Sequence, residues 1–161
     1  SKFDPAGIKK LKNLTAILKA IKNSESKFIS RGDDSGTHKM ELALWLQADE
    51  TPQNFSVNWY WEVGAGMGAV LNIASELSAY VISDRASWLN FGRKGDLDIL
   101  FEGDEELFNQ YSYLPISKVK YPNIAYKNAR LVEDWLVSSK AGYLMQNYKI
   151  RGQNLFFPNS K

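Results

Sequence analysis

The first part of the chain spaces its apolar residues as an amphipathic helix does. Between positions 4 and 24, the apolar residues that recur at this spacing are Ile8, Leu11, Leu14, Leu18 and Ile21. Lysines lie between them, so the pattern predicts a helix with one buried face and one solvated lysine face. A short apolar run at 27–30 then predicts a buried strand, and the mostly apolar segment 37–48 predicts a buried helix.

Farther along the chain, strand-like runs alternate with helix-like runs. Strands are predicted at 58–63, 79–83, 97–101 and 111–117. Helical segments are predicted at 69–77, 84–91, 104–108, 121–139 and 140–150. Pro122 suits the first turn of a helix, where its missing N–H group costs nothing. Strands that alternate with helices predict an α/β fold with a largely parallel sheet.

The composition excludes several classes of function. The 161 residues carry a formal net charge of +2 and no dense run of lysine or arginine, so we expect no nucleic-acid partner. The chain has no cysteine and one histidine, which excludes thiol catalysis, disulfides and multi-histidine metal sites. It has no apolar run of about 18 residues, so no membrane-spanning helix is expected.

The stretch from Ser30 to Thr37 has the composition of an anion-binding loop. It joins the predicted strand at 27–30 to the predicted helix at 37–48, and it contains two glycines. The start of a helix offers unpaired N–H groups and the positive end of the helix dipole, which together attract anions. The side chains that add donors are Ser30, Arg31, Ser35 and Thr37.

Three other interpretations of this stretch are open. Ser35 or Thr37 could simply cap the helix while Arg31 pairs with Asp33 or Asp34. The tripeptide Arg-Gly-Asp at 31–33 could be an adhesion motif, but its position between a buried strand and a helix disfavours this. A calcium loop would need oxygen ligands at alternating positions and a final glutamate, and that pattern is absent.

A second glycine-rich loop, 63–70, follows the strand predicted at 58–63. Gly64, Gly66 and Ala69 match the G-x-G-x-x-[GA] pattern of dinucleotide-binding folds, and Asp84 follows Gly64 by 20 residues. This pattern makes an NAD(P)-dependent oxidoreductase the alternative function. The preceding strand is aromatic and polar, however, whereas a central parallel strand is usually aliphatic.

The same loop also suits a small oxyanion. Glycine turns that lead into helix starts hold phosphate-like groups without a nucleotide. The residues that would offer such a turn are Gly66, Met67 and Gly68. Arg85 adds a cation at the end of the strand predicted at 79–83, where ligands of open α/β sheets bind. Its alternative role is an ion pair with Asp84 or Glu62.

Several longer stretches together resemble one family of proteins. They are FISRGDDSGTHKMELALW (28–45), WYWEVGAGMGAVLNIASELSAYVISDRASWLNF (59–91), LDILFEGDEELFNQYS (97–112) and LFFP (155–158). In this order they resemble the substrate-binding proteins of tungstate-type ABC importers, and the resemblance covers most of the chain.

The resemblance implies a type II periplasmic-binding-protein-like α/β fold, whose two lobes close on an oxyanion. It implies a tungstate or molybdate ligand, no cofactor and no enzymatic activity. It also implies a periplasmic or other extracytoplasmic location and the membrane permease of an ABC importer as partner. Ser30, Arg31 and Thr37 match motif residues that contribute to the family's site, and Arg85 matches a second family arginine.

The sequence departs from the family at its start. Family members begin with a threonine- and serine-rich oxyanion loop on the other lobe, and no such loop occurs here, so the resemblance implies a missing N-terminal segment. Residues 1–96 are then expected to form one complete lobe, and 97–161 the crossover strands and C-terminal helices of a partial one. A site with one wall should bind weakly, and uncovered apolar surface favours self-association of the chain.

Overall fold

The chain divides into two compact units, with the division between Asn109 and Gln110. A computed structural model describes residues 3–159. We call the part up to Asn109 unit 1 and the part from Gln110 unit 2. No helix within the described residues is long and apolar enough to cross a bilayer.

A three-stranded parallel sheet forms the centre of unit 1. Its strand order is β2-β1-β3, and both neighbours of β1 run parallel to it. Phe28 in β1 lies opposite Tyr60 on one side and Tyr80 on the other, so these three side chains share one face of the sheet. The strands are β1 (Phe28–Ser30), β2 (Tyr60–Glu62) and β3 (Tyr80–Val81). The predicted parallel α/β architecture is therefore confirmed.

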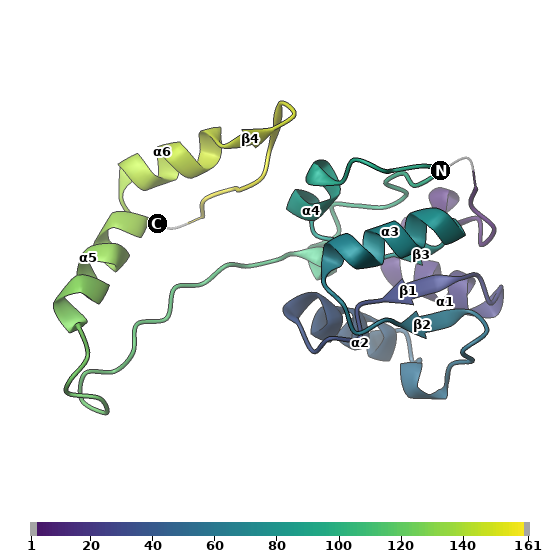
Figure 1. The fold of residues 1–161 in the computed structure, drawn as a ribbon, viewed down its shortest axis with the longest axis horizontal. Coiled ribbons are helices and arrows are strands. Elements are labelled where there is room, and N and C mark those ends of the chain that lie inside the picture. Colours follow the sequence, from purple (N-terminus) through teal and green to yellow (C-terminus); the bar gives the residue numbers. More distant parts are fainter. Residues whose placement is uncertain (1–2, 160–161) are drawn as a thin grey trace. The chain divides into compact units, whose positions relative to one another are not determined.

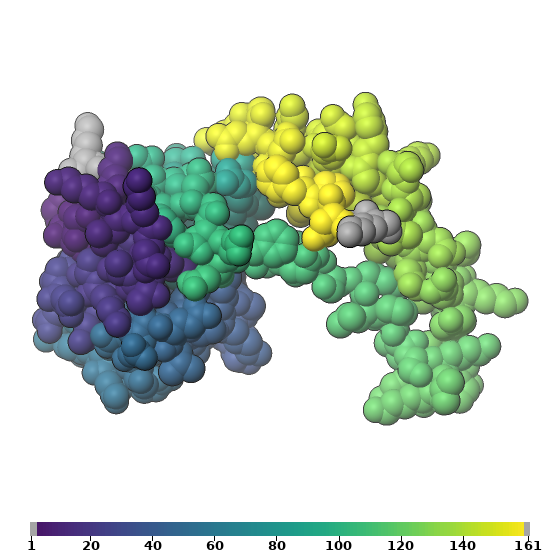
Figure 2. Space-filling model, turned by 180° about the vertical axis from the view of Figure 1, so that it is seen from behind, coloured from purple at the N-terminus to yellow at the C-terminus, as the bar shows by residue number. Residues whose placement is uncertain are grey.

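Helices cover both faces of this sheet (Figure 1). The face of Phe28 packs against α1 (Leu14–Asn23) and α2 (Gly36–Gln47), and Figure 2 shows this side from outside, in purple and blue. Its centre is aromatic: the Phe28 ring lies 5.4 Å from the Trp45 ring, edge to face. The opposite face, which carries Ile29, packs against α3 (Met67–Leu77).

Shorter elements complete unit 1. Three are 3-10 turns and one is a short helix: η1 (Ile8–Lys10), η2 (Pro52–Asn54), η3 (Glu105–Leu107) and α4 (Arg85–Asn90). The segment after α4 returns across the unit, and its apolar residues pack against the two cores. These residues are Leu97, Leu100, Phe101 and Leu107. The packing explains why unit 1 extends to Asn109.

Unit 2 has little core of its own. It contains α5 (Tyr126–Leu136), α6 (Ser139–Asn147) and a hairpin of β4 (Lys149–Ile150) and β5 (Gln153–Asn154). Among its described residues, Ala141 is the one that is buried. Large apolar side chains on both helices are exposed, among them Leu131, Trp135, Tyr143 and Leu144.

Two predicted helix starts are wrong. The helix predicted over 4–24 begins only at Leu14, because Asn13 caps it there: the Asn13 Oδ1 accepts the Ala16 amide at 2.9 Å. Ile8 lies in a separate 3-10 turn but is still buried in the core. Pro122 does not open the next-to-last helix, since α5 begins at Tyr126.

The strands predicted at 97–101 and 111–117 are also wrong. Both segments are without regular secondary structure in the described chain. A strand requires a neighbour to satisfy its backbone N–H and C=O groups, and neither segment has one here. An apolar run predicts burial, but it does not show that a neighbouring strand is present, and so the strand predictions failed here.

Candidate anion-binding site

Three loops meet at one edge of the sheet in unit 1. Each follows a strand and leads directly into a helix: 31–35 opens α2, 63–66 opens α3, and 82–84 opens α4. Because the strands are parallel, their carboxyl ends lie at the same edge, which is where open α/β sheets bind ligands. The site residues predicted from the sequence lie on these loops, on the helix starts, or at the end of β1.

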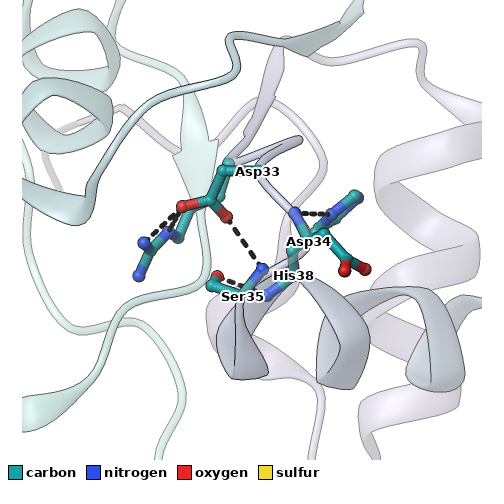
Figure 3. Close-up of polar contacts among 5 residues, drawn as sticks. Asp33, Asp34, Ser35 and His38 are labelled. Atoms are coloured by element: carbon teal, nitrogen blue, oxygen red, sulfur yellow. Dashed lines mark hydrogen bonds and ion pairs between the residues drawn. The ribbon is translucent and has the colours of Figure 1, made fainter.

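The carboxylate of Asp33 fixes the first loop (Figure 3). Its Oδ1 accepts the Ser35 amide at 3.2 Å. Its Oδ2 accepts the Nε–H of Arg31 at 3.1 Å and pairs with the Arg31 Nη2. Ser35 is the N-cap of α2, and its Oγ accepts the His38 amide at 3.3 Å. The capping serine and the Arg31–Asp33 pair, both considered from the sequence, are therefore present.

These contacts keep Asp33 ionised. Hydrogen bonds from Ser35, and then from Arg31, lower the pKa of its carboxyl from 3.8 to about 2. A folded-state pKa below the unfolded value means that the ionised group stabilises the fold. This stabilisation is present above about pH 4 and is lost as the pH falls toward about 2.

We expect Asp33→Asn to remove part of the acid dependence of stability. The wild-type free energy of unfolding should fall between about pH 4 and pH 2, and the variant should show a shallower fall because an amide does not titrate. Urea unfolding at closely spaced pH values measures both slopes. Asp34→Asn is the control, since its carboxylate is 87% exposed. Equal slopes for wild type and Asp33→Asn would contradict the assignment.

The first two loops are joined along their backbones. The Ala65 amide donates to the Arg31 carbonyl at 3.1 Å. Gly32 packs against Glu62 of β2: the φ of Gly32 is 57°, and a Cβ atom at this position would lie 2.7 Å from the Glu62 Cβ. Glycine is required here by the positive φ and by the close approach. The junction holds the loops that open α2 and α3 side by side.

The starts of both helices offer unpaired amides. Within residues 3–159, the amides of Gly36 and Thr37 in α2 and of Met67 and Gly68 in α3 donate to no protein acceptor. Gly66 caps α3 without a side-chain hydrogen bond, and the Met67 side chain is buried, so this turn offers its backbone. Helix-start amides together with the positive dipole ends are suited to bind an anion.

Ser30 lies beneath the first loop. It is fully buried on the face of β1 that packs against α2, and its Oγ makes no hydrogen bond within the described chain. On that face Glu41 of α2 is 2% exposed, and its Oε1 accepts the Tyr60 hydroxyl at 2.7 Å. Burial raises the pKa of the Glu41 carboxyl, and the Tyr60 hydrogen bond opposes the rise. Because Ser30 is fully buried, its hydroxyl is out of contact with solvent.

The third loop presents a paired cation. Asp84 is the N-cap of α4, and its Oδ1 accepts the Ser87 amide at 2.8 Å. Arg85 is the first residue of α4 and is exposed, and its Nη2 pairs with Glu102. The alternative prediction that Arg85 pairs with Asp84 or Glu62 is therefore wrong. Glu102, in the segment after α4, pairs with Arg85 instead.

His38 also contacts the first loop, and no sequence pattern predicted this. The His38 Nδ1 accepts the Asp34 amide at 3.1 Å, and its Nε2 lies 3.3 Å from the Glu62 Oε1. One signal could have drawn attention to it: Ser35, His38 and Glu41 are spaced by three residues and so share one side of α2. The contact with Glu62 crosses to another strand and has no signal in the local sequence.

A comparison with protein families assigns the chain to one of them. It belongs to the PBP superfamily, because residues 2–140 match the model of a PBP superfamily domain. The predicted periplasmic-binding-protein-like fold is therefore confirmed.

Individual relatives define the likeness more narrowly. The chain is 44% identical over 150 residues to the tungstate-binding protein TupA of Peptoclostridium acidaminophilum, covering 92% of this chain and 51% of that protein. It is similar to the structure of the tungstate binding protein TupA from Desulfovibrio alaskensis G20, with a TM-score of 0.85 and 36% identity over 98% of this chain and 64% of that one. For the tungstate ABC transporter structure from Geobacter sulfurreducens, the TM-score is 0.77 and the identity 40%, over 92% of this chain and 62% of that one.

The chain spans about half the length of the curated relatives that it matches. The resemblance to tungstate-type binding proteins inferred from the sequence is confirmed by these likenesses. They give no support to the oxidoreductase alternative. The cap role of Asp84 also accounts for that carboxylate without a bound ribose.

Proposed function

We propose that this chain carries one ligand-binding wall of a solute-binding protein that captures tungstate-like oxyanions for an ABC importer. The observation that carries the proposal is the backbone contact between Arg31 and Ala65, which joins two loops that open helices with unpaired amides. An arginine at the same junction adds a forked cationic donor. The tungstate-binding relatives indicate the class of ligand.

The proposed chemistry is hydrogen bonding and charge complementarity. Tungstate and molybdate are tetrahedral dianions that accept hydrogen bonds in all directions. The amides that open α2 and α3 donate to such an ion, the Thr37 hydroxyl adds a neutral donor, and Arg31 adds a charged one. Arg85 on the third loop is a second cation that can exchange its Glu102 partner for the ligand. Binding of this kind needs no cofactor and no catalytic step.

We further propose that the two parts of the chain belong to different lobes, residues 1–96 to one and 97–161 to the other. The exposed apolar side chains of α5 and α6 support this, because such surfaces are usually covered by other polypeptide. The compact unit 1 extends to Asn109 because the returning segment packs on its cores. Closure of the second lobe would supply donors from the far side of the anion and signal the bound state to the permease.

An oxyanion titration of thermal stability tests the proposal. Tungstate and molybdate are expected to raise the melting temperature more than sulfate or phosphate does, because a ligand that binds only the folded state stabilises it. At a free ligand concentration about 100 times the Kd, this stabilisation is about 2.7 kcal/mol. Five tryptophans provide the fluorescence signal.

The matched comparison among anions separates a formed site from general charge attraction. We expect a small shift for the 161-residue chain and a larger one for the longest polypeptide that carries this sequence, because donors on both sides of the anion strengthen binding. Equal shifts for all four anions would contradict the proposal and indicate a nonspecific basic surface.

A further inference from the structure

The imidazole of His38 is enclosed between the first loop and β2. Its side chain is 11% exposed, and its Nδ1 accepts the Asp34 amide at 3.1 Å (Figure 3). An acceptor at Nδ1 places the proton of the neutral ring on Nε2, which lies 3.3 Å from the Glu62 Oε1. Nε2 makes no hydrogen bond within the described residues, so the ring holds the Asp34 peptide through Nδ1 and lies close to the strand against which Gly32 packs.

The Asp34 peptide needs such an anchor. Its φ is 58°, in the left-handed region that residues other than glycine rarely adopt. The Asp34 carboxylate is 87% exposed and contacts the exposed Lys39 ammonium at 3.3 Å, so it restrains the backbone weakly. The hydrogen bond from the Asp34 amide to the largely buried His38 ring is the stronger restraint. On either side of Asp34 in sequence stand Asp33, which holds Arg31, and Ser35, which caps α2.

We propose that His38 is a positioning residue for oxyanion binding. The neutral ring, with its proton on Nε2, holds the Asp34 peptide and thereby fixes Arg31 and the start of α2 in the arrangement that binds the anion. This inference rests on the proposed function. A substitution that removes the Nδ1 acceptor leaves the Asp34 amide without its partner, so the loop is released and the affinity for the oxyanion falls.

A nitrogen NMR spectrum of the histidine ring tests the tautomer directly. The chain has one histidine, so the ring signals need no assignment among several residues. In the ligand-free protein at about pH 7.5 we expect Nδ1 without a proton and Nε2 with one. A ring protonated on Nδ1 at this pH would overturn the inference, because that nitrogen could not accept the Asp34 amide.

Two variants separate the two ring nitrogens. His38→Asn places a non-titrating acceptor near the position of Nδ1, whereas His38→Gln places its amide near Nε2 and removes the acceptor. Calorimetry with tungstate at about pH 7.5 should show His38→Asn within about two-fold of wild type and His38→Gln about three- to ten-fold weaker.

Comparing His38→Asn with His38→Gln also distinguishes the proposed positioning role of His38 from a merely structural one. Loss of packing would lower the melting temperature of both variants and leave their affinities for tungstate equal to each other. Wild-type affinity in His38→Gln, or equal affinities in the two variants, would overturn the inference. If the longest polypeptide that carries this sequence binds no tungstate, the proposed function fails and the inference that rests on it fails too, whereas an altered ring spectrum with tungstate binding intact overturns the role of His38 alone.

Discussion

Replacing Arg31 with alanine is expected to weaken tungstate binding by about ten- to a hundred-fold. A hydrogen bond to a charged group contributes about 1.5–3 kcal/mol, and the variant removes the forked cation from the junction of the two loops. The stability of the ligand-free protein should fall slightly, because Asp33 loses its pairing with Arg31 but keeps the hydrogen bond from the Ser35 amide. Calorimetry and melting curves of wild type and variant measure the two quantities.

Two further variants define what Arg31 contributes. Arg31→Lys keeps the charge and loses the planar fork, so its affinity should lie between those of wild type and Arg31→Ala. Arg130→Ala removes a guanidinium that pairs with Glu133 in unit 2, outside the three loops, and should leave the affinity unchanged. Unchanged affinity in Arg31→Ala, together with reduced stability, would mean that Arg31 serves only its pair with Asp33.

The first loop could be predicted from the sequence because its structure is local. A hydroxyl before an apolar helix predicts an N-cap, and Ser35 is that cap. The glycines between strand and helix predict a turn that needs positive φ, and Gly32 has it. Each of these signals depends on residues within one turn of the chain.

Contacts between distant segments had no comparable signal. Arg85 pairs with Glu102, 17 residues away, because the segment after α4 returns across unit 1. The contact of His38 with Glu62 likewise depends on the pairing of β1 with β2. Residues 97–101 look like a strand because they are apolar, but their apolar side chains pack against the cores without a neighbouring strand. The apolar pattern therefore predicted correctly that side chains of this segment pack against the cores. It predicted wrongly that the segment pairs with another strand.

Replacing Gly32 with alanine is expected to lower the free energy of unfolding by about 2–5 kcal/mol. A left-handed backbone costs a residue with a Cβ about 1–2 kcal/mol, and overpacking adds about 1–3 kcal/mol. Both apply here, because the φ of Gly32 is 57° and the new Cβ would lie 2.7 Å from the Cβ of Glu62. Relief requires β2 and the first loop to separate, which also breaks the contact between Arg31 and Ala65. Urea unfolding measures the loss.

Gly36→Ala is the matched control for this prediction. Gly36 opens α2 four residues later, its φ is not positive, and a Cβ there would meet no heavy atom within 4 Å. Its replacement should leave the free energy of unfolding unchanged or raise it slightly, because alanine loses less backbone entropy than glycine on folding. Tungstate binding should fall in Gly32→Ala even under conditions where the variant is fully folded, since the loops that open α2 and α3 would no longer lie side by side. A folded Gly32→Ala protein with wild-type affinity would show that the junction stabilises the lobe without forming the anion site.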